Sequence, residues 1–226
     1  MTEKAIIFFF KYPQKGQVKT RLAASLGDEL TCTLYGHFIS DILKACMSAH
    51  GETVLAFSKS GDSATGDIPG TGSIKSFEQR GDDLGQRMFN AFVDTRKLGF
   101  KKAVIIGSDL PHLSTEILNN TLNLLDEYST VVGPSTDGGY YLLGIDLNDL
   151  NARLFDAVPW STGEVLNITI ERINEMGSLK FLLPEMEDVD DMDSLKRFYF
   201  THKDKGSNLD SVGFLKENEN RILKLF

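Results

Sequence analysis

Short apolar runs alternate with amphipathic stretches along the whole chain. Residues 4–11 form a nearly continuous apolar run between two lysines, closed by Pro13 and Gly16, which predicts a buried central strand. Further runs predict strands at 53–58, 73–77, 102–106, 130–133, 140–145 and 180–183. Helical periodicity predicts helices at 18–26, 28–49, 83–97, after a cap near Ser114, at 161–176 and twice after the acidic stretch 185–193.

The order of these elements determines the fold class. Strands that alternate with helices are joined by right-handed crossovers, so we expect a mostly parallel sheet with helices on both faces, a three-layer α/β/α sandwich. Ser161 and Glu164 form a capping-box pattern that predicts a helix start, and the glycine- and serine-rich stretch 59–72 predicts an exposed loop. Because no repeat, low-complexity tract or long linker interrupts the pattern, we expect one domain over residues 1–226.

Composition and charge narrow the function classes. The 226 residues are 41% hydrophobic and 25% charged, and the formal net charge of −8 argues against an electrostatic nucleic-acid or anionic-membrane binder. The apolar run near the start is far shorter than the ~20 residues that span a bilayer. Cys32 and Cys46 share one predicted helix, roughly 21 Å apart, and cannot pair. Reduced cysteines without a targeting signal favour the cytoplasm.

The average charge conceals a basic segment near the N-terminus. Residues 4–27 contain five cations and no acid, whereas the rest of the chain carries 19 cations and 32 acids. The loop from Lys11 to Leu22 joins a strand end to a helix start, where backbone amides and cations suit a diphosphate. This loop lacks the Gly-x-x-x-x-Gly-Lys-Ser/Thr spacing of the Walker A phosphate-binding motif. A solvated basic turn is the competing interpretation, but the carboxyl end of a strand is where ligands of such sheets bind.

Two further loops at strand ends carry an aspartate. Asp109 follows the apolar strand 102–106 beside small residues, which suits a hard divalent cation that bridges phosphate oxygens, although it can equally cap the next turn. In the run Asp137-Gly138-Gly139-Tyr140, the glycines allow a sugar or nucleotide to approach the backbone and the tyrosine offers a stacking face. A hairpin turn with a packed tyrosine explains the same glycines.

The acidic run from Asp188 to Asp193 also has two interpretations. Favourable charges at a helix start account for Asp191 and Asp193 without any ligand. One member, Asp190, can instead complete the metal site that begins with Asp109. The four histidines show neither metal spacing nor a nucleophile pattern, which argues against zinc and catalytic-triad chemistry, and Trp160 is typical of a core or interface anchor.

Three motifs, in this order, resemble a known family. They are Lys11-x-Pro13-x-x-Gly16-x-x-Lys19-Thr20-Arg21-Leu22, Gly107-x-Asp109-x-Pro111 and Gly133-Pro134-x-x-Asp137-Gly138-Gly139-Tyr140. Together they resemble the radical-SAM/selenodomain-associated transferases, a branch of the nucleotide-diphospho-sugar transferase (GT-A) superfamily, over nearly the whole chain. The resemblance implies a GT-A-like fold and a transferase that uses a nucleotide with Mg²⁺ or Mn²⁺.

The resemblance also implies residue roles. More distant relatives guanylylate phospholactate or uridylylate sugar phosphates; they hold the triphosphate with a Lys/Arg loop and meet the nucleobase with a Gln-x-x-x-x-Gly segment. Gln79 and Gly85 resemble that segment, with the glycine one residue later. Asp109 stands where the superfamily's metal-binding aspartate does, although Gly107 replaces the first acid of the usual Asp-x-Asp. The expected nucleotide-binding residues are Lys11, Gly16, Lys19, Thr20, Arg21, Gln79 and Gly85.

Two transfer reactions and one binding role stay open. We favour glycosyl transfer from a nucleoside-diphosphate sugar to an unknown small-molecule acceptor, because residues 16–21 replace the Gly-x-Gly-Thr-Arg signature of the nucleotidyltransferases. Lys19 and Arg21 then neutralise the phosphates with Lys11, Asp109 and Asp190 hold the metal, and Asp137 is the base or sugar-hydroxyl acceptor beside Gly138, Gly139 and Tyr140. The alternatives are nucleotidyl transfer onto a phosphorylated small molecule with release of pyrophosphate, and a nucleotide-binding module with little turnover.

Overall fold

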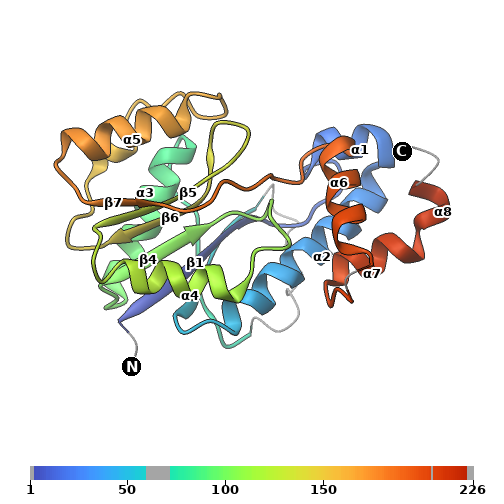
Figure 1. Ribbon diagram of the computed structural model, residues 1–226, viewed down its shortest axis with the longest axis horizontal. Coiled ribbons are helices and arrows are strands. Elements are labelled where there is room, and N and C mark those ends of the chain that lie inside the picture. Colours follow the sequence, from blue (N-terminus) through green and yellow to red (C-terminus); the bar gives the residue numbers. More distant parts are fainter. Residues whose placement is uncertain (1–2, 60–71, 205, 223–226) are drawn as a thin grey trace.

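The computed structural model describes residues 3–59, 72–204 and 206–222, in which one sheet carries helices on both faces (Figure 1). The strands are β1 Lys4–Lys11, β2 Glu52–Ser58, β3 Lys75–Glu78, β4 Lys102–Ile106, β5 Thr130–Pro134, β6 Tyr140–Asp146 and β7 Lys180–Leu182. The helices are α1 Thr20–Leu26, α2 Asp28–Met47, α3 Leu84–Lys97, α4 Thr115–Leu124, the 3₁₀ helix η1 Ala152–Leu154, α5 Val165–Glu175, α6 Met192–His202, α7 Asp210–Glu217 and α8 Glu219–Ile222. The expected loop 59–72 lies almost wholly outside the described residues.

The seven strands follow the order β3-β2-β1-β4-β6-β5-β7. Strand β1 lies near the middle and pairs in parallel with β2 and β4, so that Ile6 stands opposite Thr53 on one side and Val104 on the other. Strand β6 is antiparallel to both of its neighbours because a short turn joins it to β5 as a hairpin. The prediction of a mostly parallel α/β sheet is therefore confirmed.

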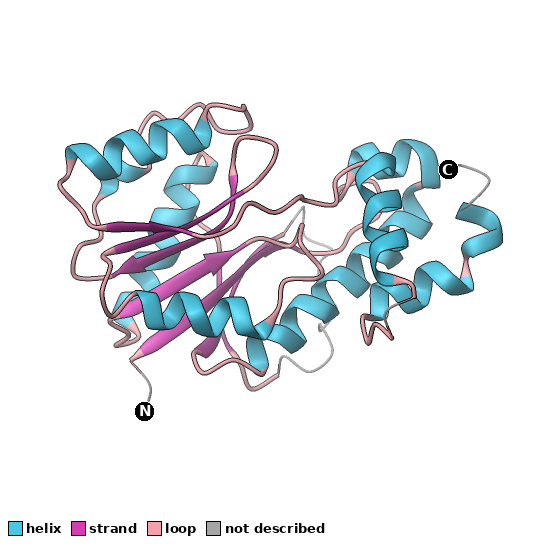
Figure 2. Ribbon diagram, viewed as in Figure 1, coloured by secondary structure: helices cyan, strands magenta, loops and turns pink. Residues whose placement is uncertain are grey.

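Two hydrophobic cores lie on the two faces of the sheet, between its strands and the helices that Figure 2 shows around them. Successive side chains of a strand point to opposite faces, so Ile6 and Phe8 of β1 pack with α2 and α4 while Ala5 and Ile7 pack with α3. All four are fully buried, which explains why this strand appears in the sequence as a continuous apolar run. Among the described residues, no helix combines the length and apolar character needed to cross a bilayer.

The start of α5 differs from the sequence prediction. The Ser161–Glu164 capping box is wrong: the helix begins at Val165, and no side chain caps it. The amide of Leu166 instead donates to the carbonyl of Gly138 at 2.8 Å, so the turn between β5 and β6 satisfies this helix end. Ser161 therefore does not cap the helix, and its backbone is left-handed with φ 65°.

The C-terminal helices form a lobe beside the sheet, at the right of Figure 1. Buried Asp41 of α2 anchors this lobe, because its carboxylate accepts the amides of Asp210 and Ser211 at 2.6 and 3.0 Å and the Ser211 hydroxyl at 2.6 Å. Residues 183–191 connect β7 to α6. Along this segment the amide of Leu183 donates to Val132 of β5, and the amide of Val189 donates to the carbonyl of Asp109. The segment therefore crosses the carboxyl edge of the sheet.

Candidate active site

Two adjoining cavities open at the carboxyl edge of β1 and β4. The first, of about 300 Å³, we call the basic recess; it is lined by Lys11, Gln17, Val18, Lys19, Thr20, Arg21, Tyr35, Ser108, Asp109 and Asp190. The second, of about 390 Å³, we call the aromatic pocket; its walls include Phe9, Phe10, Met88, Tyr140, Trp160, Asp137 and Asp188. Lys11, Ser108, Asp109 and Asp190 line both cavities, so a single ligand can extend from one into the other.

Tyr35 of α2 holds the two strand ends together at this junction. Its hydroxyl donates to the carbonyl of Lys11 at 3.1 Å, accepts the Lys11 amide at 3.3 Å and lies 2.9 Å from the hydroxyl of Ser108. Burial raises the pKa of Tyr35 to about 12, so the phenol stays protonated and keeps these bonds at neutral pH. This role could not be predicted from the sequence, because Tyr35 has the spacing of an ordinary buried helix residue.

Only part of the predicted basic cluster faces the cavities. Lys11, Lys19 and Arg21 line the recess. Lys4 lies at the far end of β1, where it bonds Asp126, and Lys15 turns away to pair with Glu29 at 2.8 Å. Of the five cations in residues 4–27, Lys4 and Lys15 therefore do not line the recess: a strand of eight residues separates Lys4 from the loop, and Lys15 pairs with Glu29.

Lys19 is the buried cation of the recess. Its ammonium lies 2.5 Å from Oδ1 of Asp109 and 2.5 Å from Oδ1 of Asp190, and its side chain is only 5% exposed. Burial alone would lower the pKa of Lys19, but the two carboxylates outweigh it and raise that pKa to about 12. Lys19 also has a left-handed backbone, φ 46° and ψ 50°, directly before α1. Such a conformation in a residue other than glycine is strained and is typical of functional sites.

A carboxylate that we did not predict from the sequence, Asp188, joins this group. Its Oδ2 accepts the hydroxyl of Ser135 at 2.9 Å, while its buried Oδ1 has no hydrogen-bond partner among the described residues. Burial, followed by the charge of Asp109, raises the pKa of Asp188 to about 7. The spacing Asp188-Val189-Asp190 could have indicated this, because in an extended segment alternate side chains share one side, and Val189 is buried.

These side chains have the chemistry that a hard divalent cation requires. Asp109, Asp188 and Asp190 supply carboxylate oxygens, the ligands that Mg²⁺ and Mn²⁺ prefer, and the unpartnered Oδ1 of Asp188 is available for a further bond. As they stand, no three metal-ligating side chains of the described residues converge on one point. The ammonium of Lys19 fills the space between the carboxylate oxygens of the two predicted ligands, Asp109 and Asp190.

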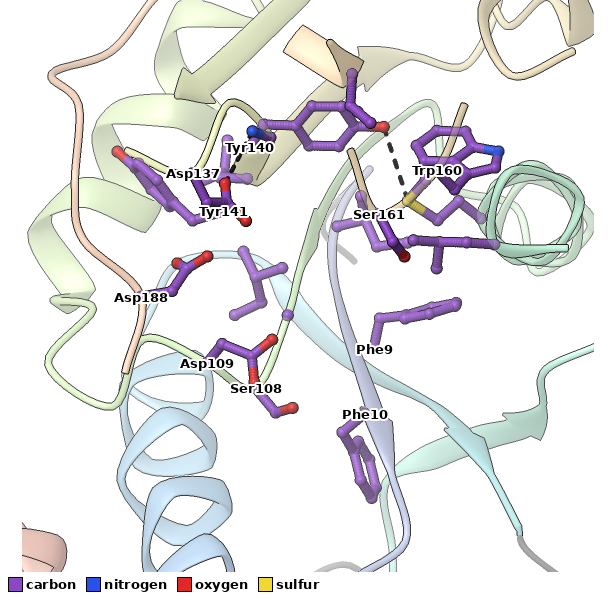
Figure 3. Close-up of a pocket in the computed structure, with 18 of the residues that line it drawn as sticks. Phe9, Phe10, Ser108, Asp109, Asp137, Tyr140, Tyr141, Trp160, Ser161 and Asp188 are labelled. Atoms are coloured by element: carbon purple, nitrogen blue, oxygen red, sulfur yellow. Dashed lines mark hydrogen bonds between the residues drawn. The ribbon is translucent and has the colours of Figure 1, made fainter. Parts of the chain in front are cut away.

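The predicted Asp137–Tyr140 turn forms one wall of the aromatic pocket. Figure 3 shows Asp109, Asp137 and Asp188 on one side of the pocket and Phe9, Trp160 and Ser161 on the other. Asp137 accepts the amide of Gly139 at 2.8 Å. Gly138 has φ 86°, and a Cβ there would lie 2.3 Å from the carbonyl oxygen of Gly163, so this glycine allows the turn to pack against the loop before α5.

Tyr140 and Trp160 build the inner end of that pocket. Their rings meet edge to face with centroids 6.5 Å apart, and the Tyr140 hydroxyl points at the sulfur of Met88 (Figure 3). Burial raises the pKa of Tyr140. Trp160 therefore packs against its neighbours, as its residue type indicated. It also forms part of a cavity wall, which the sequence did not indicate.

Gln79 and Gly85 are the first and last residues of the predicted base-binding segment, and their surroundings differ. Gln79 lines the aromatic pocket, but its amide nitrogen already donates to the carbonyls of Phe10 and Ala56 at 3.1 and 2.9 Å. Only its Oε1 is left to meet a base. A Cβ at Gly85 would lie 2.6 Å from the carbonyl of Phe155 and from Trp160, so Gly85 serves the packing of α3 against the Trp160 loop. Gly16 has φ 72° in the turn that precedes the recess.

The fold defines the class of the protein: it is the α/β fold found in nucleotide-diphospho-sugar transferases. The chain belongs to a family described as uncharacterized proteins conserved in bacteria (DUF2064), whose profile matches residues 42–162, just over half of the chain. The comparison with curated proteins gave no match.

Many solved structures are similar to this chain, and three of them follow. A candidate nucleotide-diphospho-sugar transferase from Desulfovibrio desulfuricans G20 is 30% identical, with 100% of this chain and 99% of that chain covered and a TM-score of 0.92. A cytidylyltransferase from Leptospira borgpetersenii is 15% identical, covering 98% and 97%, with a TM-score of 0.59. Rv0371C from Mycobacterium tuberculosis H37Rv, solved as a complex with manganese, is 13% identical, covering 87% and 97%, with a TM-score of 0.52. The last two share the fold only.

Proposed function

We propose that the protein is a metal-dependent glycosyltransferase that transfers a sugar from a nucleoside-diphosphate sugar to a small-molecule acceptor. The observation that carries this proposal is the junction of the two cavities at Lys11, Ser108, Asp109 and Asp190. A basic cavity suits the diphosphate, an aromatic and acidic one suits the base, sugar and acceptor, and the bond to be broken then lies at the carboxylates between them. The likeness to a nucleotide-diphospho-sugar transferase supports the donor class.

The chain's own residues supply three contributions in this proposal. Lys11 and Arg21 neutralise the diphosphate in the basic recess. Asp109 and Asp190 hold Mg²⁺ or Mn²⁺, which stabilises the negative charge on the departing nucleoside diphosphate when bound. A relative with the same fold has been solved with manganese, which is consistent with that choice of ion. Thr20 lines the same recess and Gly16 lies in the turn before it, so the proposal assigns both to the segment that surrounds the phosphates.

Asp137 is the proposed base. It lies on the wall of the aromatic pocket opposite Phe9 and Trp160, where an acceptor hydroxyl would approach the sugar (Figure 3). Its carboxylate takes the proton of that hydroxyl as the new glycosidic bond forms, provided that the two oxygens come within about 2.6–3.2 Å. Gly138 and Gly139 bring the backbone of the turn close to the sugar, and Tyr140 packs behind them. Asp188 faces the same space and is the second carboxylate available there.

Nucleotidyl transfer is supported about as well by the fold, since cytidylyltransferases share it. In that reaction Lys11, Arg21 and the metal stabilise pyrophosphate as it leaves the α-phosphorus, and a phosphorylated small molecule occupies the aromatic pocket. A nucleotide-binding module with little turnover is the third candidate. The link to radical-SAM/selenodomain systems and the cytoplasmic setting, which the free Cys32 and Cys46 favour, are expectations of the same proposal.

A product assay separates the two reactions. We would incubate the protein and Mn²⁺ with UDP-, GDP-, ADP- or CDP-sugars, or with nucleoside triphosphates and phosphosugars, and measure nucleoside diphosphate and pyrophosphate separately. Release of nucleoside diphosphate that depends on an added acceptor supports glycosyl transfer. Release of pyrophosphate without nucleoside diphosphate contradicts it and supports nucleotidyl transfer, while tight binding without either product supports the binding module.

A binding screen chooses the ligands for that assay. Thermal unfolding of the protein with each nucleotide, with and without Mn²⁺, reports binding because a ligand at a hundredfold excess over its dissociation constant adds about 2.7 kcal/mol of stability. The Lys15→Met variant is a matched control, since Lys15 pairs with Glu29 outside both cavities. It should give the same shifts as the unchanged protein.

A further inference from the structure

Lys19 lies in the position that a metal between the two predicted ligands would take. Its ammonium is 2.5 Å from Oδ1 of Asp109 and 2.5 Å from Oδ1 of Asp190. A Mg²⁺ or Mn²⁺ ion that binds both oxygens lies about 2.1 Å from each, within the volume that the ammonium fills. Ammonium and metal therefore exclude each other from the gap between these carboxylates.

The contact of Lys19 is built into the fold and is not a surface ion pair. Its side chain is 5% exposed, compared with 63% for Lys15, the preceding cation of the same loop. Buried Val18 and Leu22 flank it and fix the loop, and its own backbone is held in the left-handed region. Strain of this kind persists only where the surroundings enforce it. The fold thus keeps the ammonium between the carboxylates.

Phosphate groups would offer this ammonium a second partner. Lys19 lines the basic recess beside Lys11 and Arg21, so a diphosphate bound there lies within reach of all three cations. If the phosphates attract the ammonium, the carboxylates of Asp109 and Asp190 lose their counter-charge. These carboxylates then bind a divalent cation more strongly than they do with the ammonium between them.

We propose that Lys19 is a built-in cation that occupies the metal position of the free protein and gives it up when a phosphorylated ligand enters the recess. Lys19 thereby makes metal binding depend on nucleotide binding, so that the free protein does not take up Mg²⁺ or Mn²⁺ on its own. This inference rests on the proposed function, because it takes Asp109 and Asp190 as the metal ligands.

The test is the binding of Mn²⁺ in the absence of any nucleotide. We would titrate the protein with Mn²⁺ at fixed pH and ionic strength and follow free Mn²⁺ by electron paramagnetic resonance. Lys19→Met removes the charge and keeps a side chain of similar length, and it should bind Mn²⁺ at least tenfold more tightly than the unchanged protein. The double variant Lys19→Met with Asp109→Asn should lose that gain. Equal or weaker Mn²⁺ binding by Lys19→Met overturns the proposal.

Two further variants keep the result interpretable. Lys19→Asn also removes the charge, and asparagine tolerates the left-handed backbone, so it serves if the methionine variant does not fold. Lys15→Met removes a cation from the same loop but outside the recess, and it should leave Mn²⁺ binding unchanged. If Lys15→Met strengthens binding as much as Lys19→Met, the effect is one of net charge and the proposal fails.

Adding nucleoside diphosphates separates this inference from the proposed function. UDP, GDP, ADP or CDP should raise the affinity of the unchanged protein for Mn²⁺, and the increase should be at least tenfold smaller in Lys19→Met, where the ammonium is already gone. If none of these nucleotides binds any variant, the proposed function fails. The nucleotide-free comparison of Lys19→Met with the unchanged protein still decides the role of Lys19.

Discussion

The basic recess and the aromatic pocket share four residues but are built in opposite ways. The recess is defined by charge: one continuous segment, residues 11–21, supplies its cations, and a strained backbone at Lys19 fixes the innermost one. The aromatic pocket is defined by shape, because rings from several segments pack on glycines that allow close approach. A ligand's phosphates need charge in a fixed place, whereas its organic part needs a fitted wall. The site meets these needs with different parts of the fold.

The largest expected effect comes from Asp109, which lines both the basic recess and the aromatic pocket. Asp109→Asn removes one carboxylate from Lys19 and from the proposed metal, so we expect transfer activity to fall by about 100- to 1000-fold and metal-dependent nucleotide binding to be lost. Calorimetric binding with and without Mn²⁺ measures this. Asp193→Asn is the matched control, since Asp193 is an exposed acid in the first turn of α6. Unchanged affinity in the presence of metal would favour the binding module instead.

The next effect tests whether the aromatic pocket depends on close packing. Gly138→Ala combines φ 86° with a Cβ 2.3 Å from the carbonyl oxygen of Gly163, so we expect a loss of about 3 kcal/mol in the free energy of unfolding. Urea denaturation measures it. Gly163→Ala, on the other side of the same contact, meets only an ordinary 3.6 Å neighbour and should cost far less. Equal losses in the two variants contradict the packing explanation.

A smaller effect tests whether the recess acts by charge alone. Arg21→Gln removes an exposed cation that lines the recess, so stability should be unchanged while affinity for a nucleoside diphosphate falls by about 10- to 100-fold. Affinity for the same nucleoside without phosphates should stay the same. Titration calorimetry with both ligands makes the comparison, and a loss of nucleoside affinity equal to the loss of diphosphate affinity argues against separate roles for the two cavities.

The smallest effect concerns His112, three residues after Asp109, which lines both cavities. Burial, followed by the charge of His202, lowers the pKa of His112 to about 4 from an unfolded value of about 6.5. The contribution of His112 to stability is therefore full above pH 6.5 and is lost as the pH drops toward 4, because at this residue only the unfolded chain binds the proton in that window. The ring is partly exposed, so we expect about 2 kcal/mol.

Denaturation at a series of pH values checks this prediction. His112→Gln, which does not titrate, should flatten the dependence of the unfolding free energy on pH between 6.5 and 4. His50→Gln replaces an exposed histidine and should leave the slope unchanged. If acid loosens the segment around His112 and with it Asp109, the affinities for a nucleoside diphosphate and for the nucleoside should fall together over this window, since Asp109 lines both cavities.

The same contrast explains how much the sequence predicted. Strands 4–11 and 102–106 were predicted at their observed bounds because central parallel strands are continuously apolar. The cations of the recess could also be predicted, since Lys11, Lys19 and Arg21 lie close together in the sequence between the end of β1 and the first turn of α1. The departures, Lys4 and Lys15, depend on which way a side chain turns, and that is decided by Asp126 and Glu29.

The aromatic pocket was predicted less well for a physical reason. Phe9, Ser161 and Asp188 come from distant parts of the chain, and only tertiary packing brings them together. The capping box at Ser161 failed because the carbonyl of Gly138, contributed by another turn, satisfies the start of α5. The partner that makes Lys19 a buried cation, Asp190, lies 171 residues away from it. Local sequence patterns carry no information about such pairings.

The segment 183–191 has a consequence for how the protein is made. It carries Asp188 and Asp190 across the sheet edge, and it is held in place at one end by β5 and at the other by α6, whose neighbour α7 docks on Asp41 of α2. A ribosome synthesises these parts after β1 to β6. The nascent chain can therefore assemble β1 to β6 and the cations of the recess early, yet Asp188 and Asp190 reach the sheet edge only when the later segment 183–191 has emerged and α6 and α7 have docked.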